Sequence, residues 1–558
     1  MPEKIFIGVA WPYTNGDLHL GHLAGCYVAA DIFARYHRLK GDRVLMVSGS
    51  DQHGTPITIR AEEEGVTPQV LADKYHQRQL EAWDRLGISF DLYTTTGTDN
   101  HRQVVHDIFL KLKEKGFIYT NTTPLPYCPR DKRFLPDRYV RGTCPFCGNT
   151  AARGDQCDNC GKPMNPLDLR DLRCRLCGDA PEIRDSEHFF LRLSAFQDGL
   201  LAWVRQQHHW RPNVLNFTTR YLEDGLHDRA ITRDIDWGVP VPVPGYEDKR
   251  IYVWFEAVIG YLSASKEWAQ LHGQPDAWKE FWQAPDTRAY YFLGKDNIPF
   301  HTIIWPGMLM GYDGLNLPYD VPANEFMNLG GDKFSKSAHR AVWVPDYLER
   351  YEPDPLRYYI AANMPETGDA EFTWQEFVRR NNDELVATYG NLAHRVLSFL
   401  QRNFQGKVPQ PGELDAQAQA MLSKVDAAMQ VVGQELALCR FREALHSIMS
   451  LAQEANRYID SQAPWRALKE NPAAAGTSLW VTLCAISGIK TMMYPFLPFS
   501  AQKLHNYLGF SGRIEEVGWA YQRPVPGTPL PPPSPLFTKL DDSVAEEETL
   551  RMQQATAG

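Results

Sequence analysis

The chain begins with an apolar strand that runs, through a short turn, into a helix opening on two histidines. Residues 4–10 are almost continuously apolar, and residues 20–40 have the apolar spacing of a helix that starts at His19-Leu20-Gly21-His22. A continuous apolar run is typical of a strand buried on both faces of a parallel sheet. A second strand and three further helical patterns follow at 43–47, 57–64, 67–86 and 100–115. This alternation predicts the α/β class with a doubly wound parallel sheet.

The alternation is interrupted between residues 120 and 235 and then resumes. Apolar runs at 251–255, 289–293 and 325–329 are expected to complete the sheet. From about Asn381 to Gly509 nearly all of the sequence has helical periodicity, which predicts a separate α-helical bundle. The two halves of a Rossmann-type domain are predicted at 1–119 and 236–325, with an insertion at 120–235 between them. A linker domain (326–385), an all-α bundle (386–520) and a Pro-rich then acidic tail (521–558) follow.

Length and composition narrow the class of protein. With 558 residues the chain is too long for a single core. We expect a cytoplasmic protein without membrane contact, because we find no apolar run of about 18 residues and no signal-peptide layout at the N-terminus. The net charge of −10 does not indicate a general nucleic-acid binder, so any such contact requires local basic patches.

Two groups of polar residues, far apart in the sequence, have the chemistry of a triphosphate site. His19 and His22 lie at a predicted helix N-terminus, where backbone N–H groups favour anions, and Gly21 leaves room for a nucleoside. Lys333 and Lys336 follow two glycines and supply mobile positive charges for a pyrophosphate leaving group. Taken alone, the histidine group is better explained as part of an ordinary amphipathic helix and the lysine group as a solvated basic turn. Together they predict binding of ATP with Mg²⁺.

Seven of the ten cysteines lie between Cys128 and Cys177. In a reducing compartment such a cluster favours metal over disulfides. Two CxxC pairs, Cys144/Cys147 and Cys157/Cys160, predict a closed four-thiolate zinc site with a structural role. The remaining half-sites, Cys128 with Asp131 and Cys174 with Cys177, indicate a second zinc site with three thiolates and one carboxylate, so one or two zinc ions are expected.

Several motifs together resemble one enzyme family. HLGH at 19–22 and KFSKS at 333–337 resemble the two signatures of class I aminoacyl-tRNA synthetases, with Phe334 in place of the usual methionine. The motifs AWPYTNG, DQHGTP, FLPDRY, RDSEHFF, YVWFEA, GKD and NLA are similar to those of methionyl-tRNA synthetases, and stand at 10–16, 51–56, 134–139, 184–190, 252–257, 294–296 and 391–393. The resemblance extends over roughly residues 4–510.

The resemblance implies ATP-dependent activation of L-methionine to methionyl-adenylate and transfer of the methionyl group to the 3′ end of tRNA(Met). It assigns His19, Gly21, His22, Asp296, Lys333 and Lys336 to ATP, with both histidines and both lysines catalytic. The implied methionine pocket consists of Ala10, Trp11, Tyr13, Asp51, Trp254, Ala257, Tyr261 and His301. A thioether packs well on aromatic edges, Asp51 suits an α-ammonium group, and Tyr13 and His301 offer donors to the sulfur. Trp11 and Val258 depart from the commoner Leu and Pro of the family.

The bundle is implied to read the CAU anticodon. Asn391, Arg395 and Trp465 are assigned to it, because an aromatic plane with amide and guanidinium groups suits splayed bases. Solvated surface positions and a core tryptophan are the alternative explanation. Phosphate contacts could come from Arg357, Arg379, Arg380 and Lys407, although solvated helix faces explain these residues as well. A monomer is expected, because the chain lacks the tRNA-binding dimerisation module appended to some relatives.

Three other functions fit part of the sequence. A class I synthetase for another amino acid would share the signatures, but the insertion is small for the editing domain of the leucyl, isoleucyl and valyl relatives. A small adenylyltransferase would share the histidines without needing the helical half. A zinc-containing tRNA-binding protein without catalysis would not require His19, His22, Lys333 and Lys336 to be intact.

Overall fold

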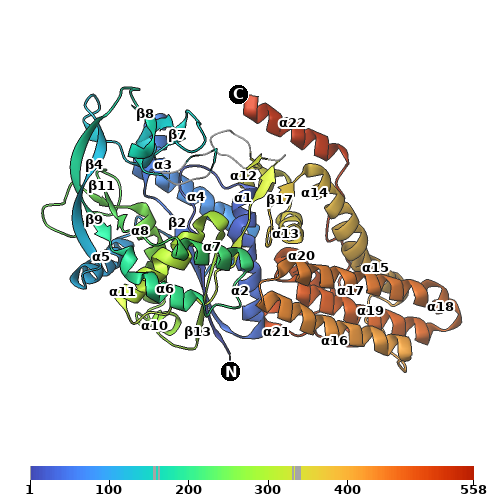
Figure 1. Cartoon of the computed structure of the whole chain (residues 1–558). Helices are drawn as coiled ribbons and strands as arrows, with labels where there is room; N and C mark the ends of the chain where they lie inside the picture. The colour runs from blue at the N-terminus through green and yellow to red at the C-terminus, as the bar shows by residue number, and fades with distance from the viewer. Residues whose placement is uncertain are drawn as a thin grey trace.

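The computed structural model describes residues 2–154, 157, 159–160, 164–329, 332–333 and 341–557, without the side chains of 137, 332–333 and 553–557. An α/β part carrying the N-terminus lies beside an elongated helical bundle, and the C-terminal helix returns from the bundle toward the α/β part (Figure 1).

A five-stranded parallel sheet forms the centre of the α/β part. Its order is β14-β13-β1-β2-β3, and all four pairings are parallel. The strands are β1 (Lys4–Val9), β2 (Arg43–Ser50), β3 (Leu92–Thr95), β13 (Thr287–Gly294) and β14 (Ala323–Asn324). Helices flank it at α1 (Leu20–His22), α2 (Val28–Lys40), α3 (Thr55–Glu64), α4 (Pro68–Leu86), α5 (Asp99–Glu114), α9 (Gly260–Leu271), α10 (Lys279–Trp282) and α11 (Trp305–Tyr312). The predicted α/β class and its first two strands are confirmed.

Two predicted strands are wrong. In place of a strand at 251–255, the chain forms the two-residue strand β12 (Arg250–Ile251) and a helical turn, α8 (Val253–Glu256). A short apolar run does not distinguish a strand from a buried helical turn. In place of a sheet strand at 325–329, β14 completes the parallel sheet, and β15 (Met327–Leu329) pairs with β16 (Asp332–Lys333) and β17 (Ala370–Phe372) in a separate sheet.

The interruption of the alternation is an insertion built on a long antiparallel hairpin. Strands β4 (Ile118–Cys128) and β9 (Glu182–Leu191) pair over their length, flanked by β5 (Arg133–Phe134) and β10 (Arg229–Ala230). A small sheet, β7-β6-β8, forms a knuckle at its tip from Ala152–Arg153, Val140–Thr143 and Arg170–Cys174. Helices α6 (Gln197–Val204) and α7 (Pro212–Glu223) and strand β11 (Thr232–Arg233) lead back to the sheet.

The bundle and the segments joining it to the sheet are helical. The joining helices are α12 (Val344–Arg350), α13 (Pro353–Ala362) and α14 (Trp374–Arg380). The bundle contains α15 (Asn391–Asn403), α16 (Ala416–Ala437), α17 (Phe441–Gln462), α18 (Pro464–Glu470), α19 (Pro472–Met493), α20 (Pro498–Tyr507) and α21 (Ile514–Val517). The last helix, α22 (Ser543–Ala557), packs on α14, and its buried Glu548 accepts hydrogen bonds from Arg350 of α12.

Helix α19 is the most apolar part of the bundle. By length and composition it is the one described helix that could cross a membrane, which qualifies the expectation that no such run exists. However, 83% of its most apolar window is buried inside the bundle, as expected of the core helix of a helical domain.

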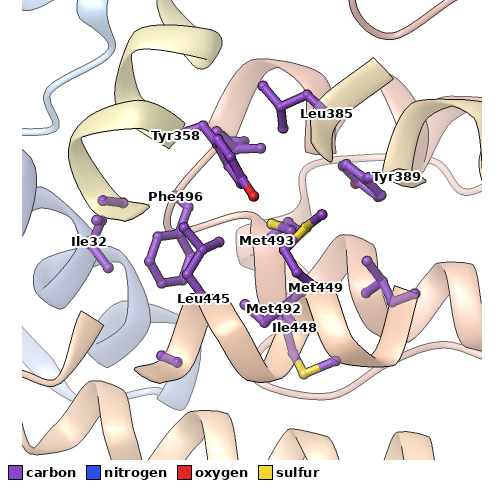
Figure 2. Close-up of a cluster of buried hydrophobic side chains, with 14 of the residues drawn as sticks. Ile32, Tyr358, Leu385, Tyr389, Leu445, Ile448, Met449, Met492, Met493 and Phe496 are labelled. Carbon is purple, nitrogen blue, oxygen red and sulfur yellow. The ribbon is translucent and has the colours of Figure 1, made fainter. Parts of the chain in front are cut away.

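The α/β part and the bundle share one continuous hydrophobic core. Ile32 of α2 and Tyr358 of α13 lie against Leu445, Met493 and other bundle side chains (Figure 2). Beside this cluster, Arg357 is completely buried and donates to Asp31 Oδ2 (2.6 Å), Phe496 O (2.8 Å), Pro495 O (3.0 Å) and Leu86 O (3.3 Å). Arg357 is therefore part of the interface, and its predicted role as a tRNA phosphate contact is wrong.

Lys490, in the middle of α19, is a buried lysine with an unusual partner. It is completely buried, its Nζ lies 3.1 Å from His505 Nδ1, and it faces the Phe510 ring at 4.9 Å. His505 Nε2 donates to Ser511 O (3.3 Å), so Nδ1 is left to accept from a neutral amine. Burial lowers the pKa of Lys490 to about 7.

This lysine should make the bundle more stable at alkaline pH. The unfolded chain takes up a proton at Lys490 as pH falls through its ordinary pKa near 10.5, whereas the folded chain does so only near 7. Stability is therefore fully retained above about 10.5 and falls between 10.5 and 7. Lys490→Met should raise the free energy of unfolding at pH 7 by ~2–4 kcal/mol and weaken its rise with pH. Denaturant unfolding at pH 7 and 9.5 tests this, with the exposed Lys503→Met as control; equal behaviour of the two variants would contradict it.

Candidate functional site

The histidine motif lies at the carboxyl edge of the parallel sheet. His19 is the N-cap of α1, and its backbone N–H donates to His22 Nδ1 (3.0 Å), which brings the ring centroids to 3.8 Å. Backbone bonds from Leu20 N to Val342 O (3.1 Å) and from Val344 N to Leu18 O (2.9 Å) tie this turn to the segment preceding α12. Ligands of open α/β sheets bind at this edge.

The other predicted nucleotide contacts are only partly described. Asp296, which the resemblance assigns to ATP, lies just beyond the end of β13 and accepts from Asn297 Nδ2 (3.3 Å). The backbone of Lys333 belongs to β16 and pairs with Asn328. Its side chain, and the whole of Lys336, lie outside the described residues.

Asp51 lies next to the aromatic residues assigned to the methionine pocket. It follows β2 and forms a parallel bridge with Tyr13, whose ring meets Trp254 edge to face at 6.3 Å. Trp254 in turn stacks on Phe300 at 4.1 Å. Asp51 is only 4% exposed, and burial, followed by the negative charge of Glu256, raises its pKa well above the usual range. A cation bound beside Asp51 would offset both the burial and the repulsion from Glu256, so this position suits an ammonium group.

Tyr261 and His301 form the deeper part of this region. The Tyr261 hydroxyl lies 2.7 Å from His301 Nε2, and His301 Nδ1 lies 2.9 Å from Asn297 O. Since the carbonyl accepts from Nδ1–H, Nε2 is the acceptor for Tyr261. Burial lowers the pKa of His301 to about 4. Both ring nitrogens are thus engaged, so in this arrangement His301 has no N–H for a thioether sulfur.

Trp11 packs between two glycines. Its ring lies so close to Gly49 and Gly260 that neither position leaves room for a Cβ, and it meets Tyr261 edge to face at 6.4 Å. Ala10 and Ala257 flank the same region in sequence, at the end of β1 and after α8. Trp11, the departure from the commoner leucine, is accommodated by these two glycines.

Sequence reasoning missed a buried ionic network beneath Asp51. The Glu256 carboxylate is completely buried and accepts from His53 Nδ1 (2.9 Å) and His101 Nε2 (2.5 Å). Burial alone would raise its pKa, but the two histidines outweigh burial and lower it to about 2. His53 N also donates to Asp51 Oδ1 (3.1 Å). The sequence did give a signal, because His53 and Glu256 lie inside motifs shared with the family and had no assigned role.

The cysteines assemble as two candidate metal sites. The sulfur atoms of Cys144, Cys147, Cys157 and Cys160 lie within 4.8 Å of one another, and so do the ligand atoms of Cys128, Asp131, Cys174 and Cys177. Tetrahedral zinc with Zn–S bonds of about 2.3 Å requires sulfur atoms ~3.8 Å apart. The sulfur–sulfur separations of 3.8 Å for Cys144–Cys160 and 3.6 Å for Cys147–Cys157 fit this requirement. Asn149 and Asn159 donate to sulfurs of this first site.

Contacts at α3 connect the knuckle to Asp51. Tyr139 donates to Thr58 Oγ1 (2.9 Å), and Arg133 pairs with Glu62 (3.1 Å). Removal of zinc should therefore loosen α3, which begins four residues after Asp51. A displacement of a substrate-binding group by about 1 Å can lower the reaction rate by about 10²-fold. The double variant Cys144→Ser/Cys157→Ser should bind less zinc, and its KM for methionine should be higher by about 10²-fold. Chelation of the unaltered protein and restoration with zinc is the control; an unchanged methionine KM without zinc would contradict the connection.

The bundle carries a surface hollow at the residues assigned to the anticodon. Trp465 follows Pro464 at the start of α18 and is 38% exposed. Arg395 lies 5.5 Å from its ring centre and is held by Asp460 (2.7 Å) and Asn456 (3.2 Å). The hollow has a volume of about 200 Å³ and includes Phe399 and Arg402. Asn391 is exposed one helical turn before Arg395.

Comparisons with known proteins agree with this architecture. Residues 5–397 match the family described as tRNA synthetases class I (M), and residues 408–556 match the anticodon binding domain of methionyl tRNA ligase. The fold and the paired signatures therefore define a class I aminoacyl-tRNA synthetase.

The relatives specify the family more closely. A methionine–tRNA ligase of Dehalococcoides mccartyi is 61% identical over 552 residues, covering 99% of this chain and 100% of that protein. One from Thermomicrobium roseum is 55% identical over 579 residues, covering 99% of each. The methionyl-tRNA synthetase of Mycobacterium tuberculosis in complex with methionyl-adenylate has a TM-score of 0.80 at 28% identity, covering 96% of this chain and 99% of that chain. The chain belongs to the methionyl-tRNA synthetase family.

Proposed function

We propose that the chain activates L-methionine with ATP to form methionyl-adenylate and then transfers the methionyl group to the 3′ end of tRNA(Met). The observation that carries this proposal is the buried Asp51, which follows β2 at the carboxyl edge of the sheet and bridges to Tyr13, whose ring meets that of Trp254. Full-length relatives with that activity support it.

The proposed pocket separates the two ends of methionine. Asp51 binds the α-ammonium group, while Trp11, Tyr13, Trp254 and Tyr261 surround the apolar thioether. Ala10 and Ala257 complete the walls, and His301 fixes the Tyr261 hydroxyl rather than contacting sulfur. Discrimination rests on shape, so shorter apolar side chains should be rejected by only a few kcal/mol.

Activation in this site needs positioning and charge stabilisation. The methionine carboxylate attacks the α-phosphorus of ATP, the bond to the bridging oxygen breaks, and pyrophosphate leaves; no general base is required because the nucleophile is already anionic. We assign His19 and His22 to the phosphates and adenosine beside Gly21, Asp296 to a ribose hydroxyl, and Lys333 and Lys336 to the leaving pyrophosphate. Magnesium accompanies ATP as its counterion.

Zinc has a structural role in this proposal. Four thiolates at Cys144, Cys147, Cys157 and Cys160 leave no open coordination position. The second set, Cys128, Asp131, Cys174 and Cys177, is proposed to bind a second zinc ion, because Asp131 Oδ2 lies 3.1 Å from the sulfur atoms of both Cys128 and Cys174. Metal analysis of the purified protein should give two zinc ions per chain.

The hollow on the bundle is proposed to read the CAU anticodon. A base stacked on Trp465 contributes about 1–3 kcal/mol. Trp465→Ala should therefore lower kcat/KM for tRNA(Met) by roughly 10- to 100-fold, without changing methionine-dependent ATP–pyrophosphate exchange. A transcript with an altered anticodon should be charged poorly by the unaltered protein and lose little more with the variant. Equal losses on both transcripts would contradict anticodon reading.

The predicted domain boundaries and a cytoplasmic monomer complete the proposal. Charging of tRNA serves protein synthesis, which supports the cytoplasm. Light scattering of the purified protein tests the oligomeric state. The function itself is tested by methionine-dependent acylation of tRNA(Met), which should fail with the other amino acids.

A further inference from the structure

The turn that carries Asp51 is anchored by a carboxylate from a distant part of the sequence. His53, two residues after Asp51, is buried, and its Nδ1 lies 2.9 Å from Glu256 Oε1. An ionised carboxylate only accepts hydrogen bonds, so the proton of this contact is on His53 Nδ1. Glu256, the last residue of α8, therefore fixes the ring of His53 and with it the turn between β2 and α3.

The backbone of His53 in turn holds the side chain of Asp51. The His53 N–H donates to Asp51 Oδ1 (3.1 Å), which fixes the orientation of this carboxylate. In the part of the chain that the structure describes, no side chain donates a hydrogen bond to the Asp51 carboxylate and no lysine or arginine pairs with it. One oxygen of the carboxylate is thus held by the protein, and Oδ2 is left for a donor group of a ligand.

A second histidine holds the other oxygen of Glu256. His101 Nε2 lies 2.5 Å from Glu256 Oε2, and His101 Nδ1 lies 2.8 Å from Ser263 Oγ. Because the Ser263 hydroxyl donates to Gly260 O (3.0 Å), it accepts from His101 Nδ1–H. The proton on Nε2 is then donated to Glu256, so the His101 ring has both protons and compensates the buried charge. Glu256, His101 and Ser263 are at most 1% exposed, so water does not compete for these contacts.

The network has a cost that stability alone does not explain. Replacing a buried ionic group by apolar side chains of similar volume is often neutral or stabilising. Moreover, the negative charge of Glu256 raises the pKa of Asp51 and so opposes the ionised form that an ammonium group requires. A carboxylate at position 256 offers two acceptor oxygens to two histidine N–H groups, which is a rigid anchor for the turn. The contribution of Glu256 to the site is therefore its geometry rather than its charge.

We propose that Glu256 and His53 are positioning residues for amino-acid activation. Glu256 holds the His53 ring, and the His53 N–H holds the Asp51 carboxylate ready for the α-ammonium group of methionine. Neither Glu256 nor the His53 side chain contacts the substrate. This inference rests on the proposed function, in which Asp51 binds that group. A carboxylate that is fixed beforehand loses less rotational freedom on binding, and a displacement by about 1 Å can lower the reaction rate by about 10²-fold.

His53→Ala should raise the KM for methionine in ATP–pyrophosphate exchange by about 10- to 100-fold and change the KM for ATP by less than about threefold. This variant removes the link to Glu256 but keeps the backbone N–H, so the donor to Asp51 remains while its position is no longer fixed. His53→Asn should restore most of the methionine affinity, since the asparagine Nδ2 takes the place of the imidazole Nδ1 and donates to Glu256. Both variants are tested as full-length, zinc-loaded protein.

The matched control is His106→Ala. His106 lies on α5, the same helix as His101, is partly buried, and makes a hydrogen bond through Nε2 to Pro240 O (2.8 Å) that does not involve the network. The control therefore removes an imidazole ring and one hydrogen bond of similar length from the same region. Both KM values should remain near those of the unaltered protein.

A methionine analogue without the amino group separates positioning from general damage to the pocket. The probe is γ-(methylthio)butyric acid, which has the thioether and the carboxylate of methionine. Its inhibition constant against methionine should be unchanged in His53→Ala, because the analogue has no group for Asp51. For the same reason, Asp51→Asn/His53→Ala should lose no more methionine affinity than Asp51→Asn alone.

The inference is overturned if His53→Ala weakens methionine and the analogue equally, whether or not its Tm falls, because the histidine then stabilises the pocket as a whole. Additive losses in the double variant would also overturn it, and so would a loss in His53→Asn as large as that in His53→Ala. Absence of methionine-dependent exchange in the unaltered protein would instead refute the proposed function, and is thus a distinguishable result.

Discussion

Asp51→Asn should reduce kcat/KM for methionine in ATP–pyrophosphate exchange by about 10²- to 10³-fold. The proposed partner of Asp51 is the α-ammonium group of methionine, in a place where the carboxylate is 4% exposed. Removing one member of a buried, hydrogen-bonded charge pair costs about 2–5 kcal/mol, because the other charge is left without a partner. The loss should appear mainly in the KM for methionine, while the KM for ATP changes little.

The same residue predicts a pH dependence. Because burial and Glu256 raise the pKa of Asp51, part of the ligand-free protein carries a protonated, neutral carboxyl group that cannot pair with an ammonium group. Methionine affinity should therefore rise with pH through the pKa of Asp51, and this rise should be absent in Asp51→Asn. The exposed Asp99→Asn is the control. If Asp51→Asn raised the KM for ATP as much as the KM for methionine, the assignment of Asp51 to the α-ammonium group would be contradicted.

Arg357→Met should lower the free energy of unfolding by about 3–5 kcal/mol. The guanidinium group is completely buried and joins Asp31 of α2 to the carbonyl groups of Pro495 and Phe496 at the end of α19. Burial alone would raise the pKa of Asp31, but Arg35 and Arg357 outweigh it and keep the pKa well below its usual range. Removal of one partner from a buried ionic group costs about this much, because charges and acceptors remain without compensation.

Denaturant unfolding measures this loss, and the matched control is Arg379→Met. Arg379 also forms ion pairs, with Glu376 and Glu384, but its side chain is 47% exposed. Surface pairs contribute about 0–1 kcal/mol, so the control should remain close to the unaltered protein. The double variant Asp31→Asn/Arg357→Met should lose less than the sum of the single changes. A loss below ~1 kcal/mol for Arg357→Met would show that the ionic contact does not hold the two parts together.

The sequence was most informative where local pattern and global fold agree. Residues 5–10 are apolar because β1 lies in the middle of the parallel sheet, so the sequence pattern and the buried environment have the same cause. His19 and Asp51 follow the first two predicted strands, and the carboxyl ends of parallel strands share an edge of the sheet. The start of α18 was predictable from Pro464, which suits the first position of a helix.

What could not be predicted depends on contacts between distant residues. Val253–Glu256 forms a helical turn. The negative charge of Glu256 is stabilised there because His53 and His101, from distant parts of the sequence, hydrogen-bond to its carboxylate. Likewise Arg357 has the sequence context of a surface residue, and only the meeting of α13 with α2 and α19 buries it. His301 lies in a short π-helical segment, Phe300–Ile304, for which no local pattern gave a signal. Such segments are often found at functional sites.

The most direct test of the account is amino-acid-dependent ATP–pyrophosphate exchange by the purified, zinc-loaded protein across the twenty amino acids. We expect strong exchange with methionine and little with the other amino acids, since Asp51 suits an α-ammonium group and the aromatic side chains suit a thioether. Exchange driven by another amino acid would contradict the assignment of the pocket. Absence of exchange with methionine would contradict the proposed activity itself.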